Sequence, residues 1–139
     1  MNGSCVFCSI ARGETPASVV YEDARTLSVV DLRQFHPGHM LVMPRRHLAD
    51  VRDLDDVDGA RLMATLARVT RAVAAAFPNE GISVWHSIGP AALQEVPHLH
   101  FHVHPRRMHD GVLRVYPSPP ALPDAETRER YALMVRERL

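Results

Sequence analysis

The chain contains no lysine, and all 16 of its basic residues are arginine. A lysine nucleophile, Schiff base or phosphate ligand is therefore excluded. The 16 acidic residues balance the arginines, and a net charge of zero gives no electrostatic case for binding nucleic acid. No stretch approaches the roughly 20 apolar residues of a membrane span. The N-terminal residues also lack the basic start and the long apolar run of a signal peptide. We therefore expect a cytoplasmic protein that binds neither nucleic acid nor a membrane.

Cysteine is scarce as well. The two cysteines, Cys5 and Cys8, have the spacing of half a zinc site or of a redox pair. A thioredoxin-like pair follows a strand and begins a helix, whereas these cysteines have no predicted strand before them, which disfavours redox chemistry. Two free buried cysteines are the simplest alternative. Because the chain has nine histidines, and two cysteines with two histidines are a common structural set, we favour zinc.

The pattern of apolar residues predicts several strands. The chain has 139 residues, 46% of them hydrophobic, which is enough for one domain with a sizeable core. β-branched runs at 18–22 and 26–31 predict a hairpin, and 39–43 and 81–86 predict two further strands. A fifth strand is predicted at 98–104.

One long helix accompanies these strands. Residues 53–77 carry apolar side chains at helical spacing, and Pro78 ends the pattern. Short hairpin connections and strands gathered around one helix predict an α+β fold with an antiparallel sheet of about five strands.

The C-terminal part of the chain differs in composition. The proline-rich segment 117–123 predicts an extended linker. A helix is predicted from Asp124 to Leu139, with Asp124 as its N-terminal cap. We expect residues 1–110 to form the main body and 111–139 to be an extension of the same domain.

The most informative segment is a row of histidines between two prolines. It reads His98, Leu99, His100, Phe101, His102, Val103 and His104. Period two is the period of a β-strand, so the four imidazoles would share one face while the apolar residues point into a core. A packing role would require a buried polar partner for each histidine, and affinity tags are contiguous and terminal. The row therefore indicates a functional surface.

Histidine can be a base, a nucleophile or a metal ligand. In a regular strand His98 and His102 would be roughly 13 Å apart, so two neighbours in the row could share a metal ion but all four could not. Arg106 and Arg107 follow the row. Imidazoles beside arginines suit an extended anion such as a chain of phosphates.

Four segments together resemble the histidine triad (HIT) family of nucleotide hydrolases and transferases. The row fits the family pattern His-φ-His-φ-His-φ-φ, where φ is apolar, except at His104. Residues 5–8, Asp31 with residues 37–47, and residues 94–97 resemble the family's other motifs. The similarity covers most of the chain and is to the Hint-like bacterial branch.

The resemblance implies a hydrolase that cleaves nucleoside phosphoramidates or dinucleoside polyphosphates at the α-phosphate and releases a nucleoside monophosphate. His100, the middle histidine, would attack the α-phosphorus and form a covalent intermediate that water hydrolyses. His102 would contact the phosphate oxygens and the leaving group, and His39 would approach the same phosphate. Gln94 and nearby backbone N–H groups would stabilise the charge on those oxygens.

The resemblance also implies a nucleotide-binding set. Asp31 would accept hydrogen bonds from the two ribose hydroxyls. Five apolar side chains match the positions that surround the base: Val6, Phe7, Ile10, Val29 and Leu32. Core packing is the alternative for several of these residues, and a turn at the end of a strand is the alternative for Asp31.

Some members of this family have a zinc site. The resemblance implies that the zinc ligands in this chain would be Cys5, Cys8, His47 and His98. Such a site would be closed and structural, and it would attach the N-terminal segment to the sheet. The resemblance further implies a homodimer that pairs through the long helix and an edge strand.

Three residues depart from the family pattern, namely Ser87, Glu95 and His104. Glu95 stands where several relatives have a small hydroxyl residue, and a carboxylate there could protonate the leaving group or repel anionic substrates. Two other functions stay open: a nucleotide- or partner-binding module with little turnover, and a metalloenzyme that uses the row for an open catalytic metal. Since an unperturbed imidazole titrates near pH 6.5, a histidine nucleophile predicts activity that falls below about pH 6.

Overall fold

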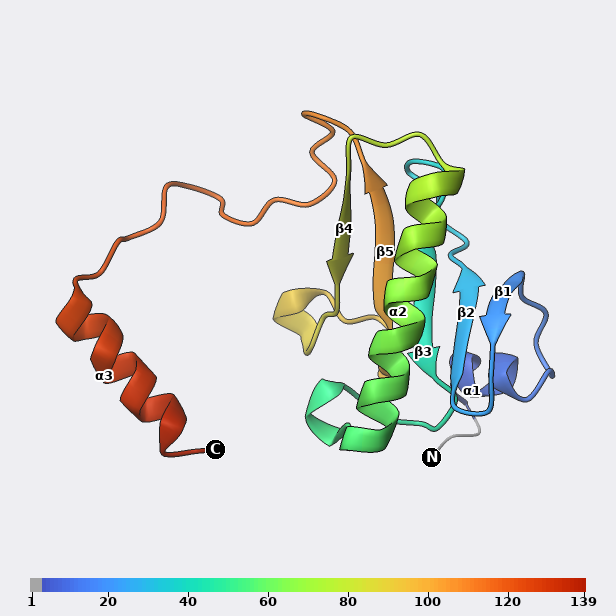
Figure 1. Ribbon diagram of the computed structural model, residues 1–139, viewed down its shortest axis with the longest axis horizontal. Coiled ribbons are helices and arrows are strands. Elements are labelled where there is room, and N and C mark those ends of the chain that lie inside the picture. Colours follow the sequence, from blue (N-terminus) through green and yellow to red (C-terminus); the bar gives the residue numbers. More distant parts are fainter. Residues whose placement is uncertain (1–3) are drawn as a thin grey trace.

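The computed structural model describes residues 4–139 and contains a five-stranded antiparallel sheet in the order β1-β2-β3-β5-β4 (Figure 1). The strands are β1 (Val19–Glu22), β2 (Thr26–Val30), β3 (Met40–Pro44), β4 (Gly81–Trp85) and β5 (Phe101–Arg106). The predicted α+β class is confirmed. The prediction that no signal peptide is present concerns residues 1–3 in part, and these lie outside the described residues.

The main difference from the predicted elements is in β5, which begins at Phe101 and not at His98. The backbone N–H of Leu99 donates to the carbonyl of Leu48, 2.7 Å away, before the ladder with β3 begins. The first two histidines of the row therefore precede the strand, and the last two lie in it. The alternation still holds, because Leu99 and Val103 are both fully buried in the core.

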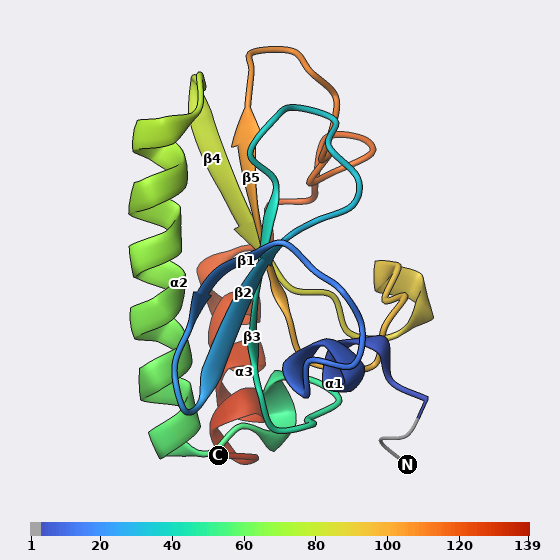
Figure 2. The ribbon, with the colours of Figure 1, turned by 90° about the vertical axis from the view of Figure 1, so that its right-hand side faces the viewer.

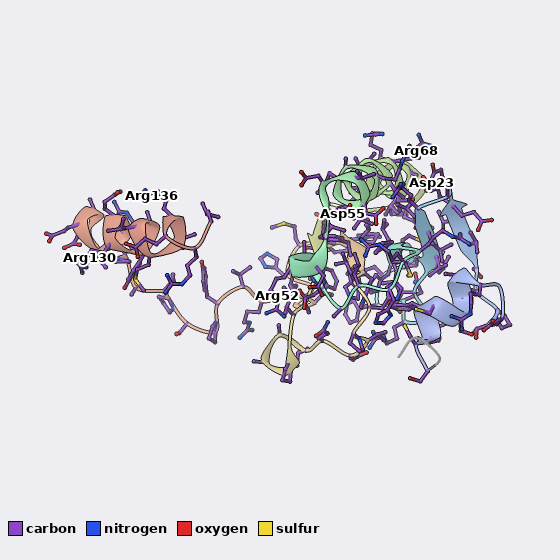
Figure 3. All side chains as sticks on the ribbon, turned by 90° about the horizontal axis from the view of Figure 1, so that it is seen from below. Asp23, Arg52, Asp55, Arg68, Arg130 and Arg136 are labelled. Carbon is purple, nitrogen blue, oxygen red and sulfur yellow. The ribbon has the colours of Figure 1, made fainter. Side chains whose placement is uncertain are left out.

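The helix α2 (Asp56–Ala76) covers one face of the sheet (Figures 1 and 2). Asp55, at the start of α2 in Figure 3, caps it by accepting a hydrogen bond from the backbone N–H of Asp58 at 2.8 Å. The apolar stripe of the helix packs on the sheet to form the main core of Met40, Val42, Leu48, Leu62, Leu66, Val69, Val73, Leu99 and Val103. Within residues 4–139, no helix combines the length and apolar character needed to cross a bilayer.

The opposite face of the sheet carries α1 (Val6–Ala11), which the sequence pattern does not predict (Figure 2). The thiol of Cys5 accepts a hydrogen bond from the backbone N–H of Cys8 at the start of this helix. A second, smaller core lies beneath α1 and consists of Phe7, Leu27, Val29, Leu41 and Met43. Two 3₁₀ helices, η1 (Val51–Asp53) and η2 (Pro90–Ala92), lie in the connections.

Residues 117–123 contain no helix or strand, as expected of a linker, and lead to α3 (Ala125–Arg136). Asp124 caps α3, because its carboxylate accepts a hydrogen bond from the backbone N–H of Thr127 at 2.8 Å. Figure 3 shows α3, with two arginines labelled, at a distance from the sheet. Its large apolar side chains are exposed: Tyr131, Leu133, Met134 and Val135.

Candidate active site

A cavity of about 370 Å³ opens on the face of the sheet that carries α1. Its walls come from the loop 31–38, the loop 92–96 and the ends of β4 and β5. The side chains of the predicted catalytic set all line this cavity: His39, Gln94, His100 and His102. The fold therefore brings together residues from separate segments of the sequence.

His100 has a fixed orientation in this pocket. Its Nδ1 donates a hydrogen bond to the carbonyl oxygen of His98 at 2.7 Å. Because a carbonyl only accepts, this bond fixes the proton on Nδ1 and leaves the lone pair of the neutral ring on Nε2. Burial lowers the pKa of His100, which favours that neutral form. Phe7 contacts the ring edge-on, with centroids 4.9 Å apart.

His39 and His102 form a directed pair. The Nδ1 of His39 donates to the carbonyl of Arg33 at 3.1 Å, so its Nε2 accepts from the Nδ1 of His102 at 2.9 Å. Asp31 lies 3.6 Å from the same Nε2. Burial, followed by the neighbouring His100 and His39, lowers the pKa of His102 to about 3, and burial also lowers the pKa of His39. Both rings are therefore neutral at pH 7.

Gln34 holds the loop that places Asp31 and His39, a role that no sequence motif indicates. Its amide Nε2 donates to the carbonyls of Asp31 at 2.7 Å and His39 at 2.8 Å. Its Oε1 accepts from the backbone N–H groups of Gly38 and His39. One amide thus satisfies four backbone groups and fixes the spacing between a carboxylate and an imidazole.

Gln94 lines the pocket, but both ends of its amide are already bound to backbone. Its Oε1 accepts from the N–H of Gly89 at 2.9 Å, and its Nε2 donates to the carbonyl of Ala49 at 3.2 Å. In this arrangement Gln94 holds the loop 92–96 in place. The predicted contact between its amide and a phosphate requires one of these hydrogen bonds to be exchanged.

The predicted nucleotide-binding residues divide into three groups. Asp31 and Phe7 line the pocket. Val29 is buried in the second core, and Ile10 packs against that core. Both side chains therefore have the core-packing role that was the alternative to binding the base. The remaining two lie outside the pocket lining with exposed side chains, Val6 and Leu32.

The four residues of the predicted zinc site converge between α1 and the sheet. The Sγ of Cys8 lies 3.2 Å from the Nδ1 of His47 and 3.5 Å from the Nδ1 of His98, and the Sγ of Cys5 lies 3.5 Å from the latter. Tetrahedral zinc, with bonds of about 2.3 Å to sulfur and about 2.0 Å to nitrogen, separates such ligands by about 3.5 Å. His98 donates its Nε2 proton to the carbonyl of Pro44, which leaves Nδ1 free for a metal. The donor set fits zinc.

Comparison with known proteins shows the family to which the chain belongs. The chain matches the sequence profile of the HIT domain over residues 12–109. The chain belongs to the HIT family. An uncharacterized HIT-like protein of Mycobacterium tuberculosis is 41% identical to it over 106 residues, covering 76% of this chain and 74% of the relative. An adenosine 5'-monophosphoramidase of Schizosaccharomyces pombe is 34% identical over 122 residues, covering 87% of this chain and 89% of the relative.

Solved HIT structures share the fold. The crystal structure of a HIT family protein from Bacillus subtilis superposes with a TM-score of 0.91 at 29% identity, covering 98% of this chain and 97% of that one. The resemblance found in the sequence is therefore confirmed, both for the family and for its fold.

The three departures from the HIT pattern share one location. Ser87, Glu95 and His104 all line the same pocket as the catalytic set. Trp85, which sequence reasoning missed, lines it as well and stacks on His102. The only available signal for Trp85 was its position at the end of a predicted strand. The pocket therefore keeps the HIT histidines while the residues around them differ.

Proposed function

We propose that this HIT protein hydrolyses nucleotides at the α-phosphate through a covalent nucleotidyl intermediate on His100. The observation that carries the proposal is the 2.7 Å hydrogen bond from His100 to the carbonyl of His98, which leaves a lone pair on Nε2 in a lined pocket. The name of the Schizosaccharomyces pombe relative supports a nucleoside phosphoramidate as substrate. Dinucleoside polyphosphates are the other substrate class in this proposal.

The reaction has two balanced steps. In the first, Nε2 of His100 forms a bond to the α-phosphorus while the bond to the leaving group breaks, and the leaving group takes the electron pair together with a proton from solvent. In the second, water attacks the phosphorus, the phosphorus–nitrogen bond breaks, and a nucleoside monophosphate departs. The attacking water releases one proton, which balances the proton taken by the leaving group. His102, held by His39, lies beside the reacting phosphate, and the backbone N–H groups near Gln94 stabilise the charge on its oxygens.

The remaining assignments extend this proposal. Asp31 binds the ribose and Phe7 contacts the base, and the exposed Leu32 and Val6 are accessible to the base as well. Zinc is structural in the four-donor site, and the donor spacing supports it. The exposed apolar side chains of α3 support a homodimer. The cytoplasmic location and the C-terminal extension at 111–139 stay predictions.

The test compares the wild type with His100→Ala on adenosine phosphoramidate and on diadenosine polyphosphates, with the release of AMP measured by chromatography. We expect release to fall at least about 10³-fold while nucleotide affinity, measured by calorimetry, is kept. His109→Ala, a change outside the pocket lining, is the matched control. Release by His100→Ala at the wild-type rate would overturn the proposal. Binding without release by the wild type would favour the binding module.

One observation favours a second candidate, a metal-dependent hydrolase. Asp31, His39 and His102 offer three ligand atoms within 4.8 Å of one another, the two-histidine, one-carboxylate set of open metal sites. Hydrolysis that requires an added divalent cation and survives in His100→Ala would support this candidate. Hydrolysis that is insensitive to chelators, with the structural zinc retained, would exclude it.

A further inference from the structure

The charged side chains of the pocket lining are few. Among residues 4–139, Asp31 and Glu95 are the carboxylates that line it, and Arg33 is the one arginine. No lysine exists in the chain to add a second cation. The other polar side chains of the described lining are histidines, Gln94 and Ser87. The lining therefore has one more carboxylate than cations.

The single arginine is engaged by both carboxylates. Arg33 donates from Nη1 to Glu95, with oxygens at 3.0 and 3.1 Å, and its Nε lies 3.7 Å from Oδ1 of Asp31. The same Oδ1 accepts the backbone N–H of Arg33 at 2.7 Å. The pair with Glu95 joins the loop 31–38 to the loop 92–96, and both of its side chains are about two-thirds exposed. A phosphate that enters the pocket thus meets an arginine already neutralised at the rim.

We propose that Glu95 sets the leaving-group preference of the site: by occupying Arg33 and by its own charge, it selects neutral or cationic leaving groups over polyphosphates. The inference rests on the proposed function, and it adds a residue that separates the two substrate classes. A phosphoramidate loses an amine, whereas a dinucleoside polyphosphate loses a group with several negative charges. In a cavity of about 370 Å³ such a group stays within one Debye length, about 8–10 Å, of the Glu95 carboxylate, so salt screens their repulsion only in part.

The position of Glu95 makes this effect local. The residue follows Gln94 in the loop 92–96 and lines the same cavity as His100. The pair with Arg33 is exposed and therefore exchangeable, so removal of the carboxylate releases the guanidinium for a phosphate. The loss of the negative charge and the freed hydrogen-bond donors of Arg33 then both favour a polyphosphate leaving group.

The test uses the zinc-loaded full chain with adenosine phosphoramidate and diadenosine tetraphosphate as substrates. We expect Glu95→Gln to raise the ratio of kcat/KM for the tetraphosphate to that for the phosphoramidate by about tenfold, the size of one like-charge contact under moderate screening. The double variant Arg33→Gln with Glu95→Gln is expected to lose part of this gain. Glu126→Gln, a matched change on the distant α3, is expected to leave the ratio unchanged.

Salt dependence supplies a readout that a structural role would not move. In the wild type, kcat/KM for the tetraphosphate is expected to rise with ionic strength because salt screens repulsion. In Glu95→Gln it is expected to fall, because salt then screens attraction to Arg33. An unchanged substrate ratio in Glu95→Gln, or an about 100-fold loss on the phosphoramidate with no gain on the tetraphosphate, would overturn the proposal, the latter by making Glu95 a general acid.

Binding separates failure of this proposal from failure of the proposed function. His100→Ala and His100→Ala with Glu95→Gln are titrated with both intact substrates by calorimetry. The charge effect predicts that the second protein gains affinity for the tetraphosphate relative to the phosphoramidate, even if no protein hydrolyses either compound. Equal ratios of the two dissociation constants in both proteins would overturn the proposal without reference to turnover.

Discussion

The indole of Trp85 stacks on the imidazole of His102, with ring centroids 4.5 Å apart and an interplanar angle of 8°. The two residues are direct partners where β4 pairs with β5. The indole covers one face of the imidazole and removes it from water, in line with burial as the main cause of the low pKa of His102. The stack thus keeps the ring neutral and in a fixed plane.

This stack makes Trp85, the one tryptophan of the chain, a reporter of the charge on His102. A protonated imidazole quenches an adjacent indole more strongly than a neutral one. We expect the fluorescence of Trp85 to be constant from about pH 8 to pH 5 and to be quenched only at lower pH, since the pKa of His102 is lowered to about 3. Circular dichroism at each pH identifies any unfolding. A quenching midpoint near 6.5, absent in His102→Gln, would contradict the prediction.

The acid limit of hydrolysis is expected at a lower pH than the sequence alone predicts. Burial lowers the pKa values of His39 and His102, so both imidazoles stay neutral below the ordinary value of about 6.5. Activity is present above these lowered values and is lost as the pH falls through them, because protonation removes the acceptor on each ring. We expect kcat/KM to stay level to below pH 6. A decline centred near pH 6.5 would count against this account.

Zinc content tests the four-donor site. We expect about one zinc per chain in protein purified without chelators, measured by mass spectrometry of the metal. Cys8→Ser is expected to lose the metal and to lower Tm by roughly 10 °C or more, since metal binding contributes directly to folding. His109→Ala, a histidine outside the donor set, is expected to keep both. Wild-type protein that contains no zinc would refute the assignment.

Gly38 tests the loop that positions His39. Its φ of +112° lies in the region that glycine favours, and an added Cβ would lie 2.7 Å from Phe77 and 2.9 Å from Pro105. We expect Gly38→Ala to lower the free energy of unfolding by about 2–4 kcal/mol in urea titrations. Gly81→Ala is the matched control, because its Cβ would meet nothing within 4 Å. Equal free energies of unfolding for the two variants would show that the loop accommodates the added Cβ at position 38 without a cost in stability.

Local patterns were enough to predict the sheet and α2, because apolar periodicity records which side of an element is buried. Placing Asp31, His39 and His100 in one site required the family resemblance, since they come from segments that only the folded chain brings together. α1 was missed because six residues are too few to show a helical period. β5 was predicted to begin three residues too early because Leu99 bonds to Leu48, a loop partner that no local pattern reveals.

The contacts that distinguish this pocket were beyond local reasoning. Arg33 and Glu95 are 62 residues apart in the chain, and no sequence pattern indicates that they pair. The stack of Trp85 on His102 depends on strand register, which turns and side-chain packing set together. Such contacts depend on how loops and strands meet, so they had to be read from the structure.

Phe7 sits between the two cysteines in sequence, and its ring contacts His98 and His100 at the same time, with centroids 5.8 and 4.9 Å away. The segment that carries the thiols therefore also supplies part of the pocket wall. Oxidation of Cys5 or Cys8, or binding of the proposed zinc by their thiolates, would act on this aromatic wall beside His100. Thiol chemistry at one end of the chain and ligand affinity in the pocket thus become thermodynamically linked through a single phenyl ring.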